Sequence, residues 1–244
     1  MASTEAPHPT ATGLAETYKD QIAGKVVLTT GVSPSGLGAS FVQSIVSAKP
    51  ALLILAGRNA AKVEETAQAL RAGPGGADVQ VRTLSLDLSS LAAVREAAAT
   101  VNGWADVEHI DVLVNNAGIM AVDYSVTADG FESHFATNHL GPFLFTNLIM
   151  DKLLAAPAPR VVMVSSDGHR LGPVRFADAN FSQGFYNKWL AYGQSKTANM
   201  LMGLSLARKL GKRGLLAFSL HPGVINTHLG DHLDWNVVFP ELRE

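Results

Sequence analysis

The sequence predicts an α/β fold in which one parallel β-sheet carries helices on both faces. Six short apolar runs rich in β-branched residues recur along the 244 residues, and stretches with helical spacing separate them. Each run is almost continuously apolar, which is typical of strands that are covered on both faces. No internal repeat and no linker divides the sequence, so we expect a single domain.

The expected strands and helices alternate in strict order. The strands fall at residues 25–31, 51–57, 79–87, 110–118, 160–166 and 215–223. The helices fall at residues 39–48, 60–72, 90–104, 133–156 and 195–210. Right-handed crossovers would place these helices over both faces of the sheet, which predicts a doubly wound, Rossmann-type arrangement. Residues 1–20 are polar and are expected to form a flexible arm, and residues 21–244 the domain.

The composition narrows the classes of function. A net charge of -2 and an isoelectric point near 6.4 do not suit a nucleic-acid-binding protein. Because there is no cysteine, disulfides, thiolate metal sites and a cysteine nucleophile are excluded. The N-terminus lacks the apolar stretch of a secretory signal, and no apolar run reaches the roughly 20 residues of a transmembrane helix. We therefore expect a cytoplasmic protein without a transmembrane segment.

Polar or glycine-rich segments follow all six expected strands. They are TGVSPSGLG, GRN, DLSS, NNAG, SSDGHR and HPGVINT. Ligands of doubly wound sheets bind beyond the carboxyl ends of the strands, where the strand order reverses. Six such segments favour a binding site at this edge over six independent turns.

The segment TTGVSPSGLG, residues 29–38, follows the first strand and opens a helix. Its glycines would let the pyrophosphate of a dinucleotide approach the free backbone N–H groups of that helix. Arg58 follows the second strand, where a carboxylate would bind the ribose of NAD. An arginine suits a 2′-phosphate, so NADP(H) is favoured over NAD(H). Without the glycine loop, Arg58 would be interpreted as a solvated residue at a helix start.

Tyr192 and Lys196 lie four residues apart in AYGQSKTAN and therefore on one face of a helix. A tyrosine, whose pKa is ordinarily about 10, can act as an acid or base near neutral pH if a cation stabilises the phenolate. Lys196 could supply that charge, although such a pair by itself is also typical of an ordinary surface contact.

The segments TTGVSPSGLG, NNAG, VSS, YGQSK and HPG, in this order, resemble the motifs of the short-chain dehydrogenase/reductase family. The long gap between the serine and the tyrosine resembles the retinol-dehydrogenase-like branch. The resemblance spans residues 25 to about 230, and the glycine loop is one residue longer than the family pattern T-G-x-x-x-G-x-G. It implies an NADP(H)-dependent oxidoreductase that interconverts a carbonyl and an alcohol on an apolar small molecule.

The resemblance also implies roles for individual residues. Tyr192 would be the general acid/base, and Lys196 would bind the nicotinamide ribose and lower the pKa of that tyrosine. Ser166 would hold the substrate oxygen, and Asn138 would support a proton-relay water. The cofactor would contact Gly31, Ser33, Ser35, Gly36, Leu37, Gly38, Arg58, Asp87, Leu88, Asn115, Ala117, Gly118, Tyr192, Lys196, Pro222, Gly223 and Thr227. For Asn115, a structural role that ties strands together is about as well supported as contact with the cofactor.

Other interpretations of the same residues are weaker. His169, His221 and His228 lack the compact spacing and the carboxylate of a metal site, so no metal is expected. Ser166 lies in no G-x-S-x-G elbow, which argues against a hydrolase. A non-catalytic dinucleotide-binding module that acts through a partner is the alternative function. It stays open because only 21 residues follow Gly223, so the C-terminal part that covers the substrate in relatives is expected to be short or missing.

Aromatic residues concentrate before and at the expected catalytic tyrosine. Residues 176–192 hold six of the 17 aromatic residues of the chain. Phe181, Phe185 and Trp189 are expected to line an apolar substrate site, and the equally weighted alternative is that these rings only anchor a long connection. The helices expected at 131–156 and 194–210 are apolar around more than one stripe, which predicts a homo-oligomer, most simply a dimer, or else burial inside a monomer.

Overall fold

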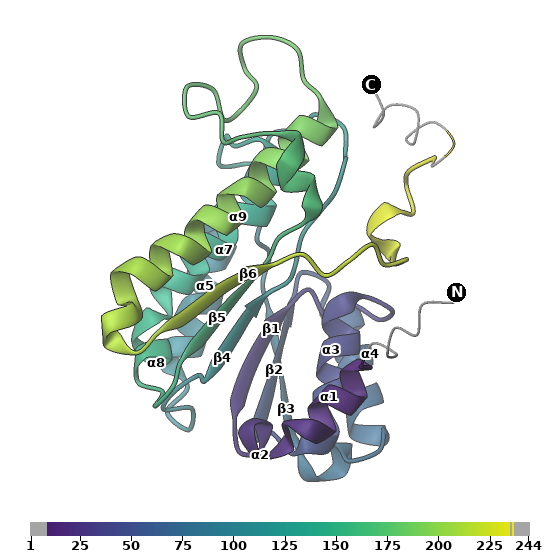
Figure 1. Cartoon of the computed structure of the whole chain (residues 1–244), viewed down its shortest axis with the longest axis vertical. Coiled ribbons are helices and arrows are strands. Elements are labelled where there is room, and N and C mark those ends of the chain that lie inside the picture. Colours follow the sequence, from purple (N-terminus) through teal and green to yellow (C-terminus); the bar gives the residue numbers. More distant parts are fainter. Residues whose placement is uncertain (1–8, 235, 237–244) are drawn as a thin grey trace, which may run out of the picture.

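Six parallel strands form one sheet in the computed structural model, which describes residues 9–234 and residue 236 (Figure 1). The strands are β1 (Val26–Thr30), β2 (Leu52–Gly57), β3 (Gln80–Ser85), β4 (Val112–Asn115), β5 (Arg160–Val164) and β6 (Leu216–Leu220). Their order across the sheet is β3-β2-β1-β4-β5-β6. Each strand lies within the run that the sequence predicted for it, and the predicted doubly wound parallel sheet is confirmed.

The strand order reverses at β1. The chain runs from β1 outward to β2 and β3, and it then returns to pair β4 with the other side of β1. Thr29 of β1 accordingly lies beside Leu55 of β2 and Val114 of β4. The carboxyl ends of β1 and β4 flank this switch point, where ligands of doubly wound sheets bind.

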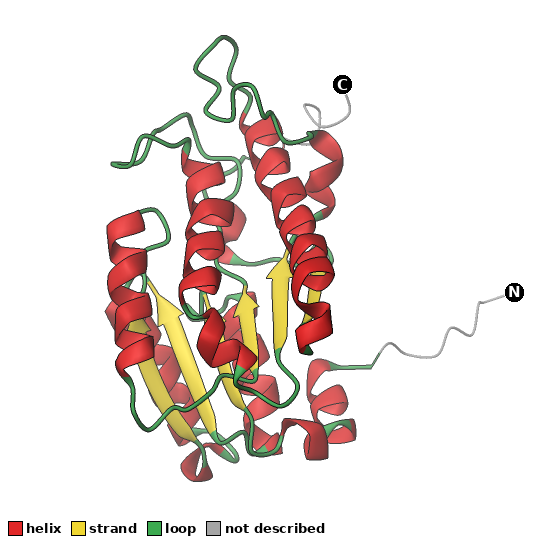
Figure 2. Ribbon diagram, turned by 90° about the vertical axis from the view of Figure 1, so that its left-hand side faces the viewer, coloured by secondary structure: helices red, strands yellow, loops and turns green. Residues whose placement is uncertain are grey.

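Helices cover both faces of the sheet (Figure 2). One layer holds α3 (Leu37–Ile45) and α4 (Ala60–Ala72), and the other holds α5 (Leu91–Gly103), α7 (Gly141–Leu148) and α9 (Lys188–Leu210). Successive side chains of β2 pack on opposite faces of the sheet. Leu53 belongs to the apolar cluster with α3 and α4, and Ile54 belongs to the cluster with α5 and α7. Both side chains are fully buried, which contributes about 1.5–3 kcal/mol each.

Two of the expected helices differ from the structure by more than a few residues. The helix expected at 195–210 begins seven residues earlier, at Lys188, because Asn187 Oδ1 accepts hydrogen bonds from Trp189 N (2.8 Å) and Leu190 N (3.0 Å) and so caps it. The helix expected at 133–156 is divided into four pieces. These are α6 (Ser133–Phe135), a π-helical turn (Ala136–Leu140), α7 and α8 (Met150–Leu154).

Two short helices, α1 (Ala11–Thr17) and α2 (Lys19–Ile22), replace most of the flexible arm that the sequence predicted for residues 1–20. Thr10 Oγ1 caps α1 by accepting a hydrogen bond from Gly13 N (3.0 Å). Ala15 is buried in the apolar cluster under α3. Ile22 of α2 packs against the same cluster, and the overall polar composition of residues 1–20 does not reveal these two apolar contacts. Residues 1–8 lie outside the described residues.

Candidate active site

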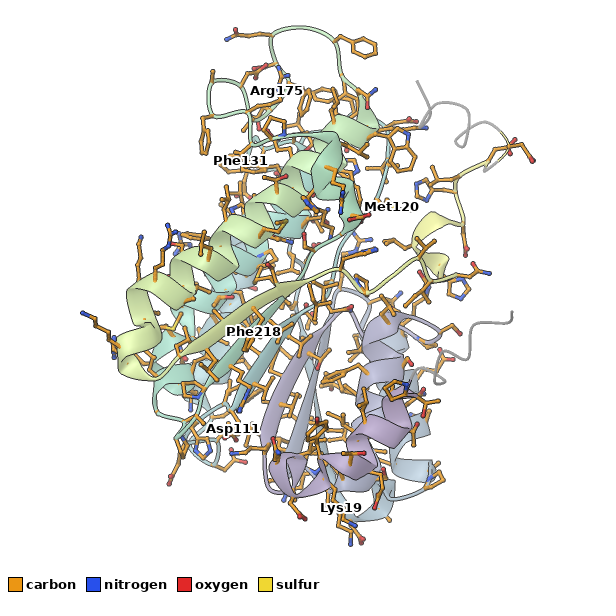
Figure 3. The ribbon with its side chains drawn as sticks, viewed as in Figure 1. Lys19, Asp111, Met120, Phe131, Arg175 and Phe218 are labelled. Atoms are coloured by element: carbon orange, nitrogen blue, oxygen red, sulfur yellow. The ribbon has the colours of Figure 1, made fainter. Side chains whose placement is uncertain are left out.

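The segments that follow β1 and β4 meet at one edge of the sheet. In Figure 3, Met120, which follows β4, lies toward this edge, whereas Asp111, which precedes β4, lies at the opposite edge. A Cβ atom on Gly31, after β1, would lie 2.6 Å from Ala117 Cα, after β4. Only glycine fits at residue 31, which also has a positive φ of 73°. The two strand ends that flank the switch point are therefore in contact.

Tyr192 and Lys196 lie one helical turn apart on α9, and both side chains are almost fully buried. Lys196 Nζ donates to the backbone oxygen of Val164 at the end of β5 (3.1 Å) and lies 5.5 Å from the centre of the Tyr192 ring. Ser165 Oγ donates to Lys196 O (2.8 Å), which holds α9 against the end of β5. The pair is thus buried and is not the surface contact that the sequence left open.

Asn138 lies in the π-helical turn between α6 and α7, a conformation that is frequent at functional sites. Ile119 N donates to Asn138 Oδ1 (2.8 Å), and Asn138 Nδ2 donates to Ile119 O (2.9 Å). Nδ2 also donates to Ser195 Oγ (2.9 Å), and the Ser195 hydroxyl donates to Tyr192 O (2.7 Å). Ser195 therefore joins Asn138 to Tyr192. Sequence reasoning missed this serine, although its place between the tyrosine and the lysine of YGQSK was an available signal.

Ser166 follows β5 and begins a short 3-10 turn (Asp167–Leu171). Its hydroxyl accepts a hydrogen bond from Gly168 N (3.0 Å). A Cβ atom on Gly168 would lie 2.7 Å from Tyr192 Cε1 and 3.3 Å from Ser166 Oγ. The serine hydroxyl and the tyrosine ring therefore both border this one glycine.

Gly118 relates the other two predicted catalytic residues in the same way. A Cβ atom on Gly118 would lie 3.0 Å from Asn138 Oδ1 and 3.5 Å from Lys196 Nζ. The backbone after β4 thus runs directly past both side chains. The structure brings together, from three separate elements, the four side chains that the sequence predicted as catalytic: Asn138, Ser166, Tyr192 and Lys196.

Burial is the largest influence on the pKa values of Tyr192 and Lys196. Burial raises the pKa of Tyr192, and the neighbouring Ser166 side chain lowers it only in part. Burial also lowers the pKa of Lys196 to about 8. The net shift at Tyr192 is upward because a phenolate is costly to remove from water, whereas the resemblance implied that Lys196 lowers the pKa of this tyrosine.

The glycine loop leads into α3, whose N-terminal N–H groups have no side-chain cap. Before the helix, Gly36 N donates to Ser33 O (3.1 Å), and Ser35 adopts a left-handed φ of 61°. This tight turn lies between Gly31 and Gly36, the interval that is one residue longer than in the family pattern. The uncapped N–H groups and the partial positive charge of the helix end suit an anionic phosphate.

Leu37 and Gly38 form the first turn of α3, and a Cβ atom on Gly38 would lie only 2.5 Å from Gly31 O. Arg58 is exposed directly after β2. At the other end of the site, the ammonium group of Lys196 has three N–H groups, of which one is used on Val164. The uncapped start of α3 fits the pyrophosphate of a dinucleotide, and the exposed Arg58 fits a 2′-phosphate. The buried Lys196 ammonium, with its spare N–H groups, fits a ribose.

Three other predicted cofactor contacts are engaged within the protein. Asp87 Oδ1 accepts hydrogen bonds from Ser89 N (2.9 Å) and Ser89 Oγ (2.6 Å). The Leu88 side chain is buried in the core. Asn115 Nδ2 donates to Thr146 Oγ1 (3.0 Å) and contacts Met163 Sδ (3.2 Å), so this side chain ties β4 to α7 and β5. The Asn115 side chain thus has a structural role through Nδ2, while its Oδ1 is buried without a hydrogen-bond partner among the described residues, and contact of Leu88 or Asn115 with a cofactor stays a prediction.

The segment after β6 holds the remaining predicted cofactor residues, Pro222, Gly223 and Thr227. Thr227 Oγ1 accepts a hydrogen bond from Leu229 N (3.4 Å) and begins a short turn. His228, in that turn, pairs with Asp231 at the surface (2.6 Å). Across the part of the chain that the structure describes, no three His, Asp or Glu side chains gather as metal ligands, and no helix is long and apolar enough to cross a membrane.

The three aromatic residues expected to line the substrate site lie in different surroundings. Phe181 is 3% exposed and packs inside the long loop (residues 172–187), where the Arg175 guanidinium lies 4.5 Å from its ring centre. Phe185 is 83% exposed, and Trp189 is 8% exposed and packs against Ala121. The three rings therefore form no continuous wall. Phe181 anchors the loop, as the alternative interpretation had it, and Trp189 alone packs against the segment after β4.

Known proteins share both the sequence and the fold. Residues 25–236 match the short chain dehydrogenase family. Retinol dehydrogenase 11 of Homo sapiens is 40% identical over 213 residues, which cover 87% of this chain and 64% of that protein. Retinol dehydrogenase 13 of Homo sapiens is 40% identical over 221 residues, which cover 91% of this chain and 65% of that protein. The chain thus spans just under two thirds of the length of these relatives.

A solved structure supports the same grouping. An uncharacterized protein from Mycobacterium paratuberculosis matches with a TM-score of 0.72 and 40% sequence identity, over 86% of this chain and 72% of that one. The family match itself extends from residue 25 to residue 236, and so from β1 to the segment after β6. The chain therefore belongs to the short chain dehydrogenase family, on its retinol-dehydrogenase-like branch.

Proposed function

We propose that this protein is an oxidoreductase that interconverts a carbonyl and an alcohol on an apolar small molecule, with NADP(H) as its cofactor. One observation carries the proposal. Four polar side chains from three separate elements gather beside the switch point of the sheet: Asn138, Ser166, Tyr192 and Lys196. Three of them, Asn138, Tyr192 and Lys196, are almost fully buried. Burial of polar side chains costs free energy, and apolar side chains at these positions would avoid that cost.

The side chains can divide the chemistry among them. The Ser166 hydroxyl and the Tyr192 ring both border Gly168, and the hydroxyls of these two residues would bond to one substrate oxygen and orient it. Tyr192 would give its proton to that oxygen in reduction and take it back in oxidation. A bound nicotinamide cofactor supplies or accepts the hydride at the adjacent carbon.

Lys196 and Asn138 would support this proton transfer. The two N–H groups of Lys196 that Val164 leaves free could bond the ribose hydroxyls, and the positive charge would stabilise the phenolate as Tyr192 loses its proton. Asn138 would support the water that returns a proton to Tyr192. Its bonds to Ile119 and Ser195 hold it in place for this role.

The choice of cofactor follows from two features of the first half of the sheet. The uncapped start of α3, after the glycine loop, would bind the pyrophosphate. The exposed guanidinium of Arg58, at the end of β2, would bind a 2′-phosphate in the bidentate manner that arginine favours. NADP(H) is therefore proposed in preference to NAD(H).

An apolar substrate is proposed for two reasons. Met120 and Ala121, after β4, pack with Trp189, one turn before Tyr192 on α9, and form a small apolar cluster. The relatives described above are named retinol dehydrogenases. An apolar alcohol and its carbonyl counterpart are thus the substrate class that the surroundings of Tyr192 support best.

Replacement of Tyr192 by phenylalanine tests the proposal. The purified protein would be screened against apolar ketones and aldehydes by following NADPH oxidation, with Tyr124→Phe as a control outside the site. Loss of the general acid should lower kcat by roughly 100- to 10,000-fold in Tyr192→Phe, with NADPH binding intact by calorimetry. Full turnover in that variant would remove the mechanism. NADPH binding without turnover of any compound by the unmodified protein would instead favour the non-catalytic module.

We also propose that the protein forms a homo-oligomer, most simply a dimer. Phe143 on α7 and Leu201 and Leu204 on α9 are large apolar side chains that stay exposed on the helices of one sheet face. Pairing of two copies through these helices would bury them. Light scattering at micromolar concentration measures the mass, and a monomer would refute the pairing. The cytoplasmic location stays a prediction.

A further inference from the structure

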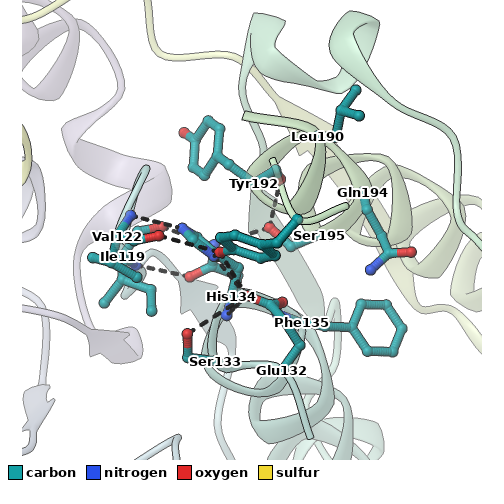
Figure 4. Close-up of polar contacts among 12 residues, drawn as sticks. Ile119, Val122, Glu132, Ser133, His134, Phe135, Leu190, Tyr192, Gln194 and Ser195 are labelled. Atoms are coloured by element: carbon teal, nitrogen blue, oxygen red, sulfur yellow. Dashed lines mark hydrogen bonds and ion pairs between the residues drawn. The ribbon is translucent and has the colours of Figure 1, made fainter. Parts of the chain in front are cut away.

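A buried polar cluster lies beside the proposed active site and takes no part in the chemistry described above. It consists of Glu132, His134 and Tyr186, and we call it the anchor cluster. Figure 4 labels Glu132 and His134 of this cluster. Glu132 and His134 are fully buried, and Tyr186 is half-buried. Glu132 and His134 lie at the start of α6, whereas Tyr186 belongs to the long loop. The cluster therefore joins two segments that are far apart in the sequence.

Glu132 provides the negative charge of the anchor cluster. Its Oε1 accepts hydrogen bonds from His134 N (3.0 Å) and His134 Nδ1 (2.7 Å), and its Oε2 accepts one from Phe135 N (2.8 Å). Burial raises the pKa of Glu132, but its contacts with His134 and with Phe135 N together hold that pKa below its ordinary value. The carboxylate is therefore ionised and is a strong acceptor.

The hydrogen bonds of His134 determine which of its ring nitrogens carries a proton. Val122 N donates to Nε2 (3.2 Å), so Nε2 is an acceptor and Nδ1 carries the proton that faces Glu132. A second proton on Nε2 would leave the Val122 N–H without its acceptor. With its proton on Nδ1, the ring satisfies both contacts and links the backbone after β4 to the carboxylate.

The hydroxyl of Tyr186 is held at the same place. Its oxygen lies 3.1 Å from Val122 O, 3.3 Å from Glu132 Oε1 and 3.2 Å from His134 Nδ1. Burial, and then the charge of Glu132, raise the pKa of Tyr186, so the phenol keeps its proton and can donate it. The ring itself packs edge-on against Tyr124, with 5.1 Å between the ring centres.

Two other side chains fasten the long loop. Glu132 N donates to Asn180 Oδ1 (3.0 Å), which adds a second tie to the start of α6. Gln194 of α9 accepts from Arg175 N (2.8 Å) and donates to Ala179 O (2.9 Å). The loop is thus held from one side by the segment before α6 and from the other by the helix that carries Tyr192.

The anchor cluster also contacts the catalytic tyrosine. The His134 ring lies edge-on to the Tyr192 ring, with 6.2 Å between their centres, and Figure 4 shows both rings in one view. One end of the cluster therefore borders the proposed acid/base, and the other holds the long loop through Tyr186.

We propose that Tyr186 is a positioning residue, which fixes the long loop beside Tyr192 through Glu132 and His134 and so makes the loop a preformed wall of the substrate site. This rests on the proposed function, because the loop borders a substrate only if Tyr192 is the reacting group. A preformed wall spares the substrate the entropic cost of ordering a loop. Loss of the anchor should therefore weaken substrate binding and leave the chemical step unchanged.

Tyr186→Phe removes the hydroxyl and keeps the ring. Tyr124→Phe is the matched control, because its ring contacts Tyr186 and its hydroxyl makes no hydrogen bond to the described residues. We expect KM for an apolar carbonyl substrate to rise roughly three- to tenfold in Tyr186→Phe, as for the loss of one hydrogen bond. The kcat and the dissociation constant of NADPH should stay within about twofold of the control.

Limited trypsin digestion gives a second measurement that needs no activity. Arg175 lies in the long loop, and cleavage after it requires the loop to open locally. Cleavage at Arg175 should be roughly three- to tenfold faster in Tyr186→Phe than in Tyr124→Phe, in proportion to the lost hydrogen bond. Asn180→Ala removes the second tie and should act in the same direction, and it replaces Tyr186→Phe if that variant does not fold.

The outcomes separate the two proposals. Unchanged cleavage in Tyr186→Phe and Asn180→Ala would overturn the anchor, and faster cleavage with an unchanged KM would overturn the positioning role. If the unmodified protein reduces no carbonyl compound, the proposed function fails. The cleavage rates then still decide whether Tyr186 anchors the loop.

Discussion

Replacement of Gly168 by alanine should move the ring of Tyr192 without removing any catalytic group. The added Cβ atom would lie 2.7 Å from Tyr192 Cε1 and 3.0 Å from Cδ1. Non-bonded carbon atoms prefer separations of at least about 3.5 Å, so the ring would have to retreat by roughly 0.8 Å. The ring is buried and His134 packs edge-on against it, so its neighbours must move as well.

The expected effect on catalysis follows from this displacement. Misplacement of a reacting group by about 1 Å can slow an enzyme about 100-fold, so kcat of Gly168→Ala should fall roughly ten- to a hundredfold. Overpacking of this kind should also lower the free energy of unfolding by about 1–3 kcal/mol. The affinity for NADPH should change little, because the three atoms nearest to the new methyl group belong to Tyr192 and Ser166 and none to Lys196.

Steady-state kinetics with an apolar carbonyl compound, urea unfolding and calorimetry with NADPH would measure the three quantities. Gly103→Ala, at the end of α5, is the matched control, because a Cβ atom there meets nothing within 4 Å. A folded Gly168→Ala protein with the kcat of the unmodified enzyme would refute the idea that Gly168 determines the position of Tyr192.

Three further substitutions test other parts of the site. Arg58→Ala should weaken NADPH binding by about 1.5–3 kcal/mol, the range for a hydrogen bond to a charged group, and should hardly affect NADH; equal calorimetric affinities of the unmodified protein for the two cofactors would contradict the assignment. Burial lowers the pKa of Lys196 from 10.5 to about 8, so between these two pH values the unfolded chain binds more protons than the folded protein. The free energy of unfolding of the unmodified protein should therefore increase with pH in this window. Lys196→Met should abolish that increase. Urea titrations across that window compare the two proteins, and equal slopes would count against the buried ammonium. Ser35→Gly should raise the free energy of unfolding by up to about 1 kcal/mol, because a left-handed conformation costs serine about 1–2 kcal/mol and glycine almost nothing; a lower urea midpoint would show that the serine side chain stabilises the turn.

The architecture could be predicted because its signals are local. A strand buried on both faces needs a continuous apolar run, as in LLILAG at β2, and the alternation of such runs with helical spacing leaves few topologies. The predicted helix bounds were wrong where the apolar pattern of the sequence carries no information on where a helix begins or is interrupted. Asn187 extended α9 by capping it, and the π-helical turn at Asn138 divided a stretch whose apolar spacing predicted one helix.

The candidate site was predictable residue by residue only where a motif marked it. The motifs named Asn138, Ser166, Tyr192 and Lys196, but they did not show that Asn115 turns into the core or that Phe185 faces solvent. No motif or period marked Tyr186, whose hydroxyl meets Glu132 across 54 positions of the chain.

The sequence by itself determined the class of fold, the order of the strands along the chain, the family and the identity of the residues able to do chemistry, because strand periodicity and motif spacing are properties of neighbouring residues. Only the tertiary structure decided which of those side chains share a site, which of them are buried in the core, and how the long loop is held beside Tyr192. Burial and hydrogen bonds decide these points, and they form between residues that lie far apart in sequence. Ser195 illustrates the difference. It lies in the motif between the tyrosine and the lysine, yet its hydrogen bond with Asn138, 57 positions away, forms only once the chain has folded.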